Sequence, residues 1–344
     1  MNELISTQDN PFVELTEQPT PVEVLEQEAE EQLGEDDVSA LSLYKMNVAK
    51  VPLLVDPFFQ STGLVCVAGS SDTGKSTFLR QLAIAVASGK REFCGFKLNA
   101  KHKSAIYVST EDDKTAIAYS LQKQVPAMRA DEAALDRLRY YFSSEDIIDK
   151  LEQRLSTYPA DLVVVDTFGD LLNGDLNSNT DVRQCLNAYK ELADRHQCLV
   201  IVLHHTGKRT EEVAPSKHNL IGSQALEGKV RAVIEMRKDV SHPQYKHLCA
   251  VKGNYLLSDV KNASYMVVLD QDTTIFSNTG ERVPFDELSV PRESRTQGAT
   301  EMAQARTIMS LHAQGKTINA IAKLVKMEAD KVKQVINQYK DSML

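Results

Sequence analysis

The sequence predicts an α/β fold: a doubly wound, mainly parallel sheet with antiparallel strands at its C-terminal end, followed by a small all-α module. Three observations predict it. Short apolar runs rich in β-branched residues alternate with longer helical stretches over 64–203, the order that parallel strands and crossover helices require. Residues 245–278 alternate apolar and polar side chains, which is typical of antiparallel strands. Residues 303–340 have apolar pairs at helical spacing.

Residues 1–38 form an acidic segment that we expect to be disordered. Of the 48 acidic residues in the chain, 12 lie here, with no Lys or Arg. Residues 39–344 therefore hold 36 acidic and all 39 basic residues, although the whole chain has a net charge of -9. That mildly basic body permits a nucleic-acid partner but does not require one.

Three further parts are expected after the acidic segment. The main α/β domain covers 39–286, and its first residues, 39–62, are expected to be an extended piece packed on the rest. A linker over 287–302 contains Pro, Arg, Ser and Gly. A helix-turn-helix-like module covers 303–344, where Gly315 breaks the first helix and Thr317 caps the second.

The first strand of the main domain leads into a phosphate-binding loop. Leu64–Ala68 is the strand, Gly69–Ser76 reads G-x-x-x-x-G-K-[ST], and an Ala-rich helix runs on to Ser88. Glycines let the backbone wrap a phosphate, and the helix N-terminus favours anions. We therefore expect ATP and Mg²⁺ as cofactors, with Lys75 on the phosphates and Ser76 on the metal. The predicted nucleotide-binding residues of this stretch are Gly69, Ser70, Ser71, Asp72, Thr73, Gly74, Lys75, Ser76 and Thr77.

Two carboxylates follow other predicted strands. Asp166 ends the apolar run from Asp161, which suits the Walker B role of holding Mg²⁺. Thr167 follows it, so the next position cannot supply a catalytic carboxylate. Glu111, after the strand at 103–109, would face the γ-phosphate across the sheet and is the predicted base.

The remaining elements of the domain follow the same alternation. Helices are expected at 115–123 and 182–195, and strands at 138–142, 198–203 and 232–236. No apolar run is long enough to span a bilayer, and the N-terminus lacks a hydrophobic signal segment, so a cytoplasmic location is expected. The five cysteines lack metal-type spacing and are expected to be reduced core residues.

The motifs GSSDTGKS, YVSTEDD, VVVDTFGD, VLHHTGK and GSQALEGKVR, in this order, resemble the RecA superfamily. Specifically, they resemble the RepA-type hexameric replicative helicases of plasmids and mobile elements, over about 64–276. The resemblance implies a RecA-like fold, a homo-hexamer and ATP hydrolysis with Glu111 as the base. It implies that His204 and His205 sense the γ-phosphate and couple it to a DNA-facing loop. It also implies that Arg231 is an arginine finger for the adjacent subunit's ATP, and that Lys252 points across the same boundary.

Two loops match those that line the central channel of RecA-like rings, 169–181 and 208–222. The second carries Lys208, Arg209 and Lys217, which suit phosphate contacts with single-stranded DNA. It also carries acidic residues and no aromatic residue for base stacking, so a merely solvated loop is the alternative.

The C-terminal module departs from the family, whose compact members need no helix-turn-helix. Over 303–340 it is basic, and Lys331 and Lys333 lie on the expected recognition helix. Double-stranded DNA is the expected partner of the module, and protein docking is the alternative. Its basic residues are Arg306, Lys316, Lys323, Lys326, Lys331, Lys333 and Lys340.

Together these features favour an ATP-driven ring motor acting on DNA, a replicative-type helicase of a plasmid, phage or mobile element. One alternative is an ATP-dependent DNA-binding regulator or loader, serving recombination or transposition without unwinding. Replication or recombination proteins are the expected further partners. Another alternative is a signalling ATPase without nucleic acid.

Overall fold

The structure is a computed structural model, and the chain divides into two units, Met1–Val51 and Pro52–Leu344. The described residues are 37–172, 178–207, 210, 212–220, 224–239, 242–289, 305, 307–309, 311–312, 315–325 and 327–340. Residues 1–36 of the expected disordered segment lie outside them, as does most of the expected linker. The predicted domain limits therefore stay predictions.

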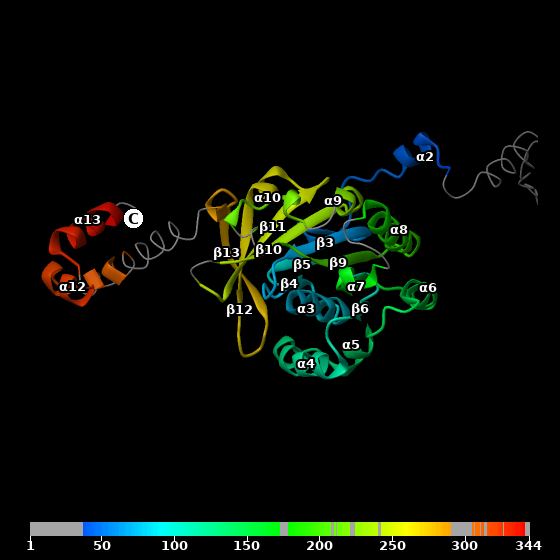
Figure 1. Cartoon of the computed structure of the whole chain (residues 1–344), viewed down its shortest axis with the longest axis horizontal. Coiled ribbons are helices and arrows are strands. Elements are labelled where there is room, and N and C mark those ends of the chain that lie inside the picture. The colour runs from blue at the N-terminus through cyan, green and yellow to red at the C-terminus, as the bar shows by residue number, and fades with distance from the viewer. Residues whose placement is uncertain are drawn as a thin grey trace, which may run out of the picture. The chain divides into compact units, whose positions relative to one another are not determined.

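A nine-stranded sheet forms the middle of the main α/β domain (Figure 1). Its strands follow one another in the order β13-β12-β11-β10-β3-β9-β8-β6-β7. The six strands from β10 to β7 pair in parallel, and β10 to β13 pair antiparallel. This confirms the predicted fold class. The strands are β3 (Gly63–Gly69), β6 (Ala105–Ser109), β7 (Leu138–Tyr141), β8 (Leu162–Asp166), β9 (Leu199–His205), β10 (Ala232–Lys238), β11 (Tyr245–Gly253), β12 (Ala263–Leu269) and β13 (Phe276–Pro284).

Helices cover both faces of this sheet, because alternate residues of each buried strand point to opposite sides. Val65 and Val67 of β3 pack into the core that contains α3, and Leu64 and Cys66 into the core that contains α6, α8 and α9. The longer helices are α3 (Lys75–Ala87), α4 (Lys114–Met128), α6 (Ile147–Thr157) and α8 (Asn179–Arg195). The shorter ones are α5 (Glu132–Asp136), α7 (Phe168–Leu171), α9 (Gln224–Lys229) and α10 (Ser258–Asn262), with 3₁₀ turns at Lys217–Asn219 and Glu287–Ser289.

The expected extended piece at 39–62 is only partly extended. Ser39 caps a short helix, α2 (Ala40–Lys45), whose residues are all exposed. Phe58 is buried against the rings of Phe96 and Tyr265, both 4.9 Å away between centroids. Here the chain adds to a small antiparallel sheet of β1 (Leu53–Asp56), β2 (Phe59–Gln60), β4 (Glu92–Phe93) and β5 (Phe96–Leu98), in the order β2-β1-β5-β4.

Two of the longer helices differ from the sequence-based expectation. α6 was not predicted, although Ile147, Leu151 and Leu155 recur every four residues and are all buried. α4 continues to Met128, past Pro126, where it was expected to end at 123. All five cysteines are free thiols; Cys66, Cys94, Cys198 and Cys249 are core residues as predicted, whereas Cys185 is only half-buried.

The C-terminal module has a small core of its own. α12 (Ile318–Val325) and α13 (Ala329–Lys340) match the predicted second and third helices. Ile321, Val332 and Ile336 are buried together with Ile308, which belongs to the predicted first helix. Arg306 and Lys326 lie outside the described residues. None of the helices in the described part of the chain has the length and apolar character that a membrane span requires.

Candidate nucleotide-binding site

The carboxyl ends of four parallel strands lie along one edge of the large sheet, and this edge brings the predicted site residues together. In register, Gly69 of β3 lies beside His205 of β9, and Ser109 of β6 beside Asp166 of β8. The backbone N–H of Thr110 donates to the Asp166 carbonyl at 2.8 Å, so the turns after β6 and β8 are joined. The carboxyl ends of parallel strands are where α/β folds bind ligands.

The loop after β3 leaves no room for larger residues at its two glycines. A Cβ on Gly69 would lie 2.4 Å from the Met236 carbonyl oxygen, and one on Gly74 would lie 2.8 Å from the Phe276 ring. Gly74 has φ of +87°, which favours glycine. Since α3 begins at the next residue, the loop delivers the N-terminus of a 13-residue helix to this edge. Backbone N–H groups held in this way suit a phosphate group.

Lys75 is buried and its ammonium lies inside the loop. Its Nζ donates to the carbonyl of Gly69 at 2.9 Å and to that of Ser70 at 2.8 Å. Burial lowers the pKa of Lys75 to about 8, against the charges of Asp166 and Glu111, which raise it. The predicted phosphate ligand and the two predicted carboxylates thus act on one another electrostatically.

Asp166 fits the predicted role of holding Mg²⁺ together with Ser76. Its Oδ2 accepts a hydrogen bond from the Tyr107 hydroxyl at 2.6 Å. Its Oδ1 is buried and has no hydrogen-bond partner among the described residues, so it remains available for a cation or a cation's water. Burial raises the pKa of Asp166, while Tyr107 and the nearby Ser76 hydroxyl lower it. A carboxylate and a hydroxyl oxygen form a donor set that suits Mg²⁺.

Glu111 and His205 meet beside this edge. His205 Nε2 lies 3.4 Å from Glu111 Oε1, and both side chains are partly exposed to solvent. His204, one residue earlier on β9, is buried, with its ring edge-on to Phe168 at 6.3 Å between centroids. The two histidines therefore have different environments, and His205 is the one that contacts the predicted base.

Two residues that sequence reasoning missed support this arrangement. Tyr107 holds Asp166, and Arg80 of α3 lies 3.4 Å from Asp112, which follows Glu111 directly. Arg80 is buried, and its Nε has no hydrogen-bond partner among the described residues. The available signal for Arg80 was a charged residue, followed by Gln81, inside the mostly apolar run from Phe78 to Ala87.

Arg231 lies at the amino ends of the parallel strands, the edge of the sheet opposite the phosphate loop. Its backbone N–H donates to the Leu64 carbonyl at 2.8 Å, and a Cβ on Gly63 would lie 3.3 Å from its Cδ. Gly63 begins β3 and Gly69 ends it. At a strand rise of about 3.3 Å per residue, those two edges are about 20 Å apart. The structure therefore does not bring Arg231 to the phosphate loop of its own chain.

Lys252 is held by its own chain, and its ammonium lies beside Val230, the residue before Arg231. It is opposite Val233 on the neighbouring strand. Its ammonium donates to the carbonyl of Glu227, and to that of Val230 at 2.8 Å, at the end of α9. Burial lowers the pKa of Lys252, against the attraction of Glu227.

The predicted channel loops are described only in part. Residues 173–177, 208–209, 211 and 221–223 lie outside the described residues, and with them Lys208 and Arg209. Lys217 forms an ion pair with Glu227 at 2.5 Å. Its ammonium is thereby engaged within the chain.

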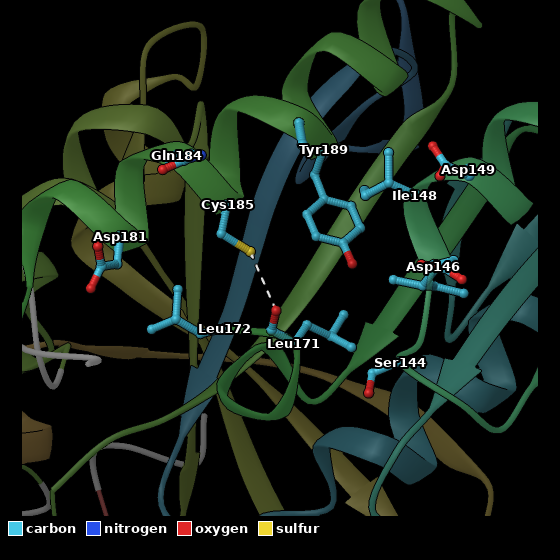
Figure 2. A pocket seen from close by; sticks show the side chains of 12 residues that line it. Ser144, Asp146, Ile148, Asp149, Leu171, Leu172, Asp181, Gln184, Cys185 and Tyr189 are labelled. Carbon is cyan, nitrogen blue, oxygen red and sulfur yellow. Dashed lines mark hydrogen bonds between the residues drawn. The ribbon is translucent and has the colours of Figure 1, made fainter. Parts of the chain in front are cut away.

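A cavity of about 380 Å³ lies between α6, α7 and α8, away from the phosphate loop (Figure 2). Asp146, Asp149 and Asp181 line it together with apolar side chains. The buried Tyr189 hydroxyl beside it has no hydrogen-bond partner among the described residues. The cavity borders the first predicted channel loop and contains none of the predicted nucleotide-binding residues.

A protein family described as AAA domain matches residues 29–211, more than half of the chain. The chain belongs to this AAA-domain family. The match includes the phosphate loop, Glu111, Asp166 and both histidines, and it ends before Arg231 and Lys252. The chain is therefore a P-loop ATPase by family, and its fold is RecA-like.

Among curated proteins, the chain is similar to the DNA repair protein RadA of Chlamydia pneumoniae, at 24% identity over 196 residues. That match covers 56% of this chain and 37% of RadA, so the chain spans little more than a third of this relative. Among solved structures, an ATPase domain aligns with a TM-score of 0.52 at 14% identity, covering 76% of this chain and 99% of that domain. The RadB recombinase aligns with a TM-score of 0.47 at 16% identity, covering 63% of this chain and 90% of its own.

Proposed function

We propose that this chain is an ATP-hydrolysing ring motor that acts on DNA, a replicative-type helicase of a plasmid, phage or mobile element. The observation that carries the proposal is the separation of the predicted site residues between the two edges of the sheet. The phosphate loop, both carboxylates and His205 share one edge, while Arg231 lies at the other. A finger that cannot reach its own nucleotide can complete the site of a neighbour in a head-to-tail ring.

Each residue has a chemical role in this proposal. The loop N–H groups and Lys75 bind the β- and γ-phosphates, and Ser76 and Asp166 hold Mg²⁺, which neutralises phosphate charge when bound. A water oxygen attacks the γ-phosphorus as the bond to the ADP oxygen breaks. Glu111 orients that water and accepts its proton, while the neighbour's Arg231 stabilises the charge of the transition state. His205, in contact with Glu111, reports the state of the γ-phosphate.

Single-stranded DNA in a central channel is the proposed partner of the two loops at 169–181 and 208–222. The name of RadA, a DNA repair protein, supports a DNA substrate. Because Lys217 is paired with Glu227, we assign the strand-facing charge of the second loop to the other two basic residues of its sequence, Lys208 and Arg209. Contacts between such cations and phosphates grip a strand without reading its sequence.

A second candidate function, a DNA-binding regulator or loader without unwinding, is favoured by the C-terminal module. Its three helices share a core of their own, and Lys323, Lys331 and Lys333 are exposed on its surface. Such a module suits double-stranded DNA, which a loader would need to find its site. Replication or recombination proteins are the proposed further partners in either case.

A strand-displacement assay on forked DNA separates the two candidates. The helicase proposal predicts Mg²⁺-ATPase activity stimulated by single-stranded DNA, together with ATP-dependent displacement by the wild type. Lys75→Ala and Glu111→Gln, as matched controls, should displace no strand. ATPase activity and DNA binding without displacement would overturn the helicase and leave the loader. Hydrolysis that neither single- nor double-stranded DNA alters would overturn both.

A further inference from the structure

Strand β10 carries a buried ion pair that the nucleotide site does not use. Glu235 is 2% exposed and Arg237 is 4% exposed. Arg237 Nε donates to Glu235 Oε1 at 2.7 Å. Both residues share the face of Val233, while Ile234 and Met236 pack into the opposite core. Two charges on a central strand are costly to bury unless their remaining hydrogen bonds are also made.

Those remaining bonds of Arg237 go to the loop that follows β9. Its two terminal nitrogens donate to the carbonyl of Val213 at 2.6 Å and to that of Thr210 at 2.5 Å. All three of these guanidinium nitrogens are therefore used, one on Glu235 and two on loop backbone. A planar guanidinium fork holds its acceptors in a fixed geometry, which a lysine cannot reproduce.

Glu235 binds the same loop further along. Its Oε2 accepts from the Ser216 backbone N–H at 3.1 Å and from the Asn219 side chain at 3.2 Å. Thr206 and Leu220 close the loop with an isolated antiparallel bridge. We call residues 206–220 the anchored segment, described at 206–207, 210 and 212–220.

The anchor lies directly beside the start of the phosphate loop. Glu235 pairs in register with Ala68, one residue before Gly69. The Met236 carbonyl occupies the space that a Gly69 side chain would need. Thr206 N–H donates to the Gly69 carbonyl at 3.1 Å. The base of the anchored segment and its buried anchor thus both contact the backbone around Gly69.

We propose that Glu235 and Arg237 are positioning residues that hold the anchored segment in fixed register with the phosphate loop, so that nucleotide state at the loop reaches the segment that faces DNA. The proposal rests on the proposed DNA motor for its functional readout. The hydrogen bonds of the pair go to the anchored segment rather than to Lys75 or Glu111, so the pair acts through the position of the segment. Without the pair, hydrolysis proceeds but no longer responds to DNA.

The test compares two double variants of the full chain with the wild type. Glu235→Gln/Arg237→Met removes both buried charges at similar volume, which avoids leaving one charge buried alone. Glu152→Gln/Arg195→Met is the matched control, because it removes an ion pair of 2.9 Å that joins α6 and α8. The measurements are the rate of trypsin cleavage within 206–220, read by mass spectrometry, and the ATPase rate with and without single-stranded DNA.

The proposal predicts that the β10 variant is cleaved within 206–220 at least about tenfold faster than the wild type, since a lost anchor favours local opening. Its stimulation by DNA should fall to near one, while its DNA-free turnover changes less than about twofold. The control should match the wild type in both. Unchanged cleavage, or retained stimulation despite faster cleavage, would overturn the proposal.

A milder variant covers the case in which the double variant does not fold. Asn219→Leu removes the hydrogen bond that the Asn219 side chain donates to Glu235 and the one that it donates to the Ala214 carbonyl. It should raise cleavage by about threefold and lower DNA stimulation in proportion, and no change in either would overturn the proposal. If the chain is not a DNA motor at all, the result is different, because DNA would then not stimulate ATP hydrolysis by the wild type either. The cleavage rates alone would then decide whether the pair positions the segment.

Discussion

The two edges of the large sheet hold different halves of the predicted chemistry. At the carboxyl ends of the parallel strands, the phosphate loop, Asp166, Glu111 and His205 contact or act on one another. At the other edge, Arg231 lies over the first residue of β3, and Lys252 binds carbonyls at the end of α9. The first edge gathers the predicted ligands of the phosphates and the attacking water, whereas Arg231 at the second edge lies too far from the phosphate loop of its own chain to act there.

The length of β3 keeps the residues at its amino end apart from those at its carboxyl end. β3 is seven residues long and fully buried, so no movement of a side chain bridges its ends. Under the proposed function, Arg231 would act on ATP only where another copy places its phosphate loop beside it. Assembly, rather than folding, would then complete the site.

The largest expected effect on ATP turnover comes from removing the side chain of Arg231. Arg231→Ala should lower ATP turnover by about 10³–10⁵-fold, since an arginine finger stabilises transition-state charge. Nucleotide affinity should change little, because the phosphate loop is intact. The measurement is steady-state ATPase at saturating ATP and protein, with Arg139→Ala, an exposed arginine of β7, as the control. Turnover within a few-fold of wild type would remove Arg231 from the mechanism.

A smaller loss of ATP turnover is expected from a change of the predicted base, Glu111. Glu111→Gln should lower turnover by about 10²–10⁴-fold, because the amide cannot accept the proton of the attacking water. ATP should bind as in the wild type, which a fluorescent nucleotide would show. Asp113→Asn is the matched control: that neighbouring carboxylate caps α4 by accepting from the Ala116 N–H. Equal losses in both variants would argue against Glu111 as the base.

The pH dependence of nucleotide affinity should follow the protonation of Lys75. Its pKa is lowered to about 8, so in the free protein it loses its proton as the pH rises through that value. Phosphate binding favours the charged form, and affinity for ADP should therefore fall above pH 8 by up to about tenfold per pH unit. Titration between pH 7.5 and 9.5 measures it. Lys75→Met should bind weakly with a flat profile, and an equally steep profile in that variant would assign the effect to another group.

The smallest effect is expected at Lys252, because its ammonium is already used by its own chain. Lys252→Met should change turnover by less than about threefold, and the loss of its two hydrogen bonds should lower the free energy of unfolding by about 1–2 kcal/mol. ATPase assays and urea unfolding give the two quantities. A loss of turnover as large as that of Arg231→Ala would instead place Lys252 across the subunit boundary.

Much of the fold follows from local patterns in the sequence. The apolar run before the phosphate loop and the runs that end at Asp166 and His205 are strands within a residue or two of the predicted bounds, because buried parallel strands must be continuously apolar. The small sheet of β1, β2, β4 and β5 was missed, because strands of two to four residues carry no readable period.

Less of the site can be predicted in this way. The phosphate loop and its carboxylates have fixed positions relative to strand ends, and the structure places them together. The Tyr107 hydroxyl, which holds Asp166, comes from an apolar run in which tyrosine looks like any core residue. Glu235 and Arg237 look like solvent-facing residues of a strand, and only tertiary contacts show that both are buried.

Mixing two inactive variants shows whether one copy supplies Arg231 to the nucleotide site of another. Lys75→Ala retains the finger but not the phosphate ligand, and Arg231→Ala retains the phosphate ligand but not the finger. In an equimolar mixture that exchanges subunits, about a quarter of the interfaces are complete, and about that fraction of wild-type ATPase activity should return. Activity in the mixture no greater than the sum of the two variants measured alone would show that Arg231 does not act in the site of another copy.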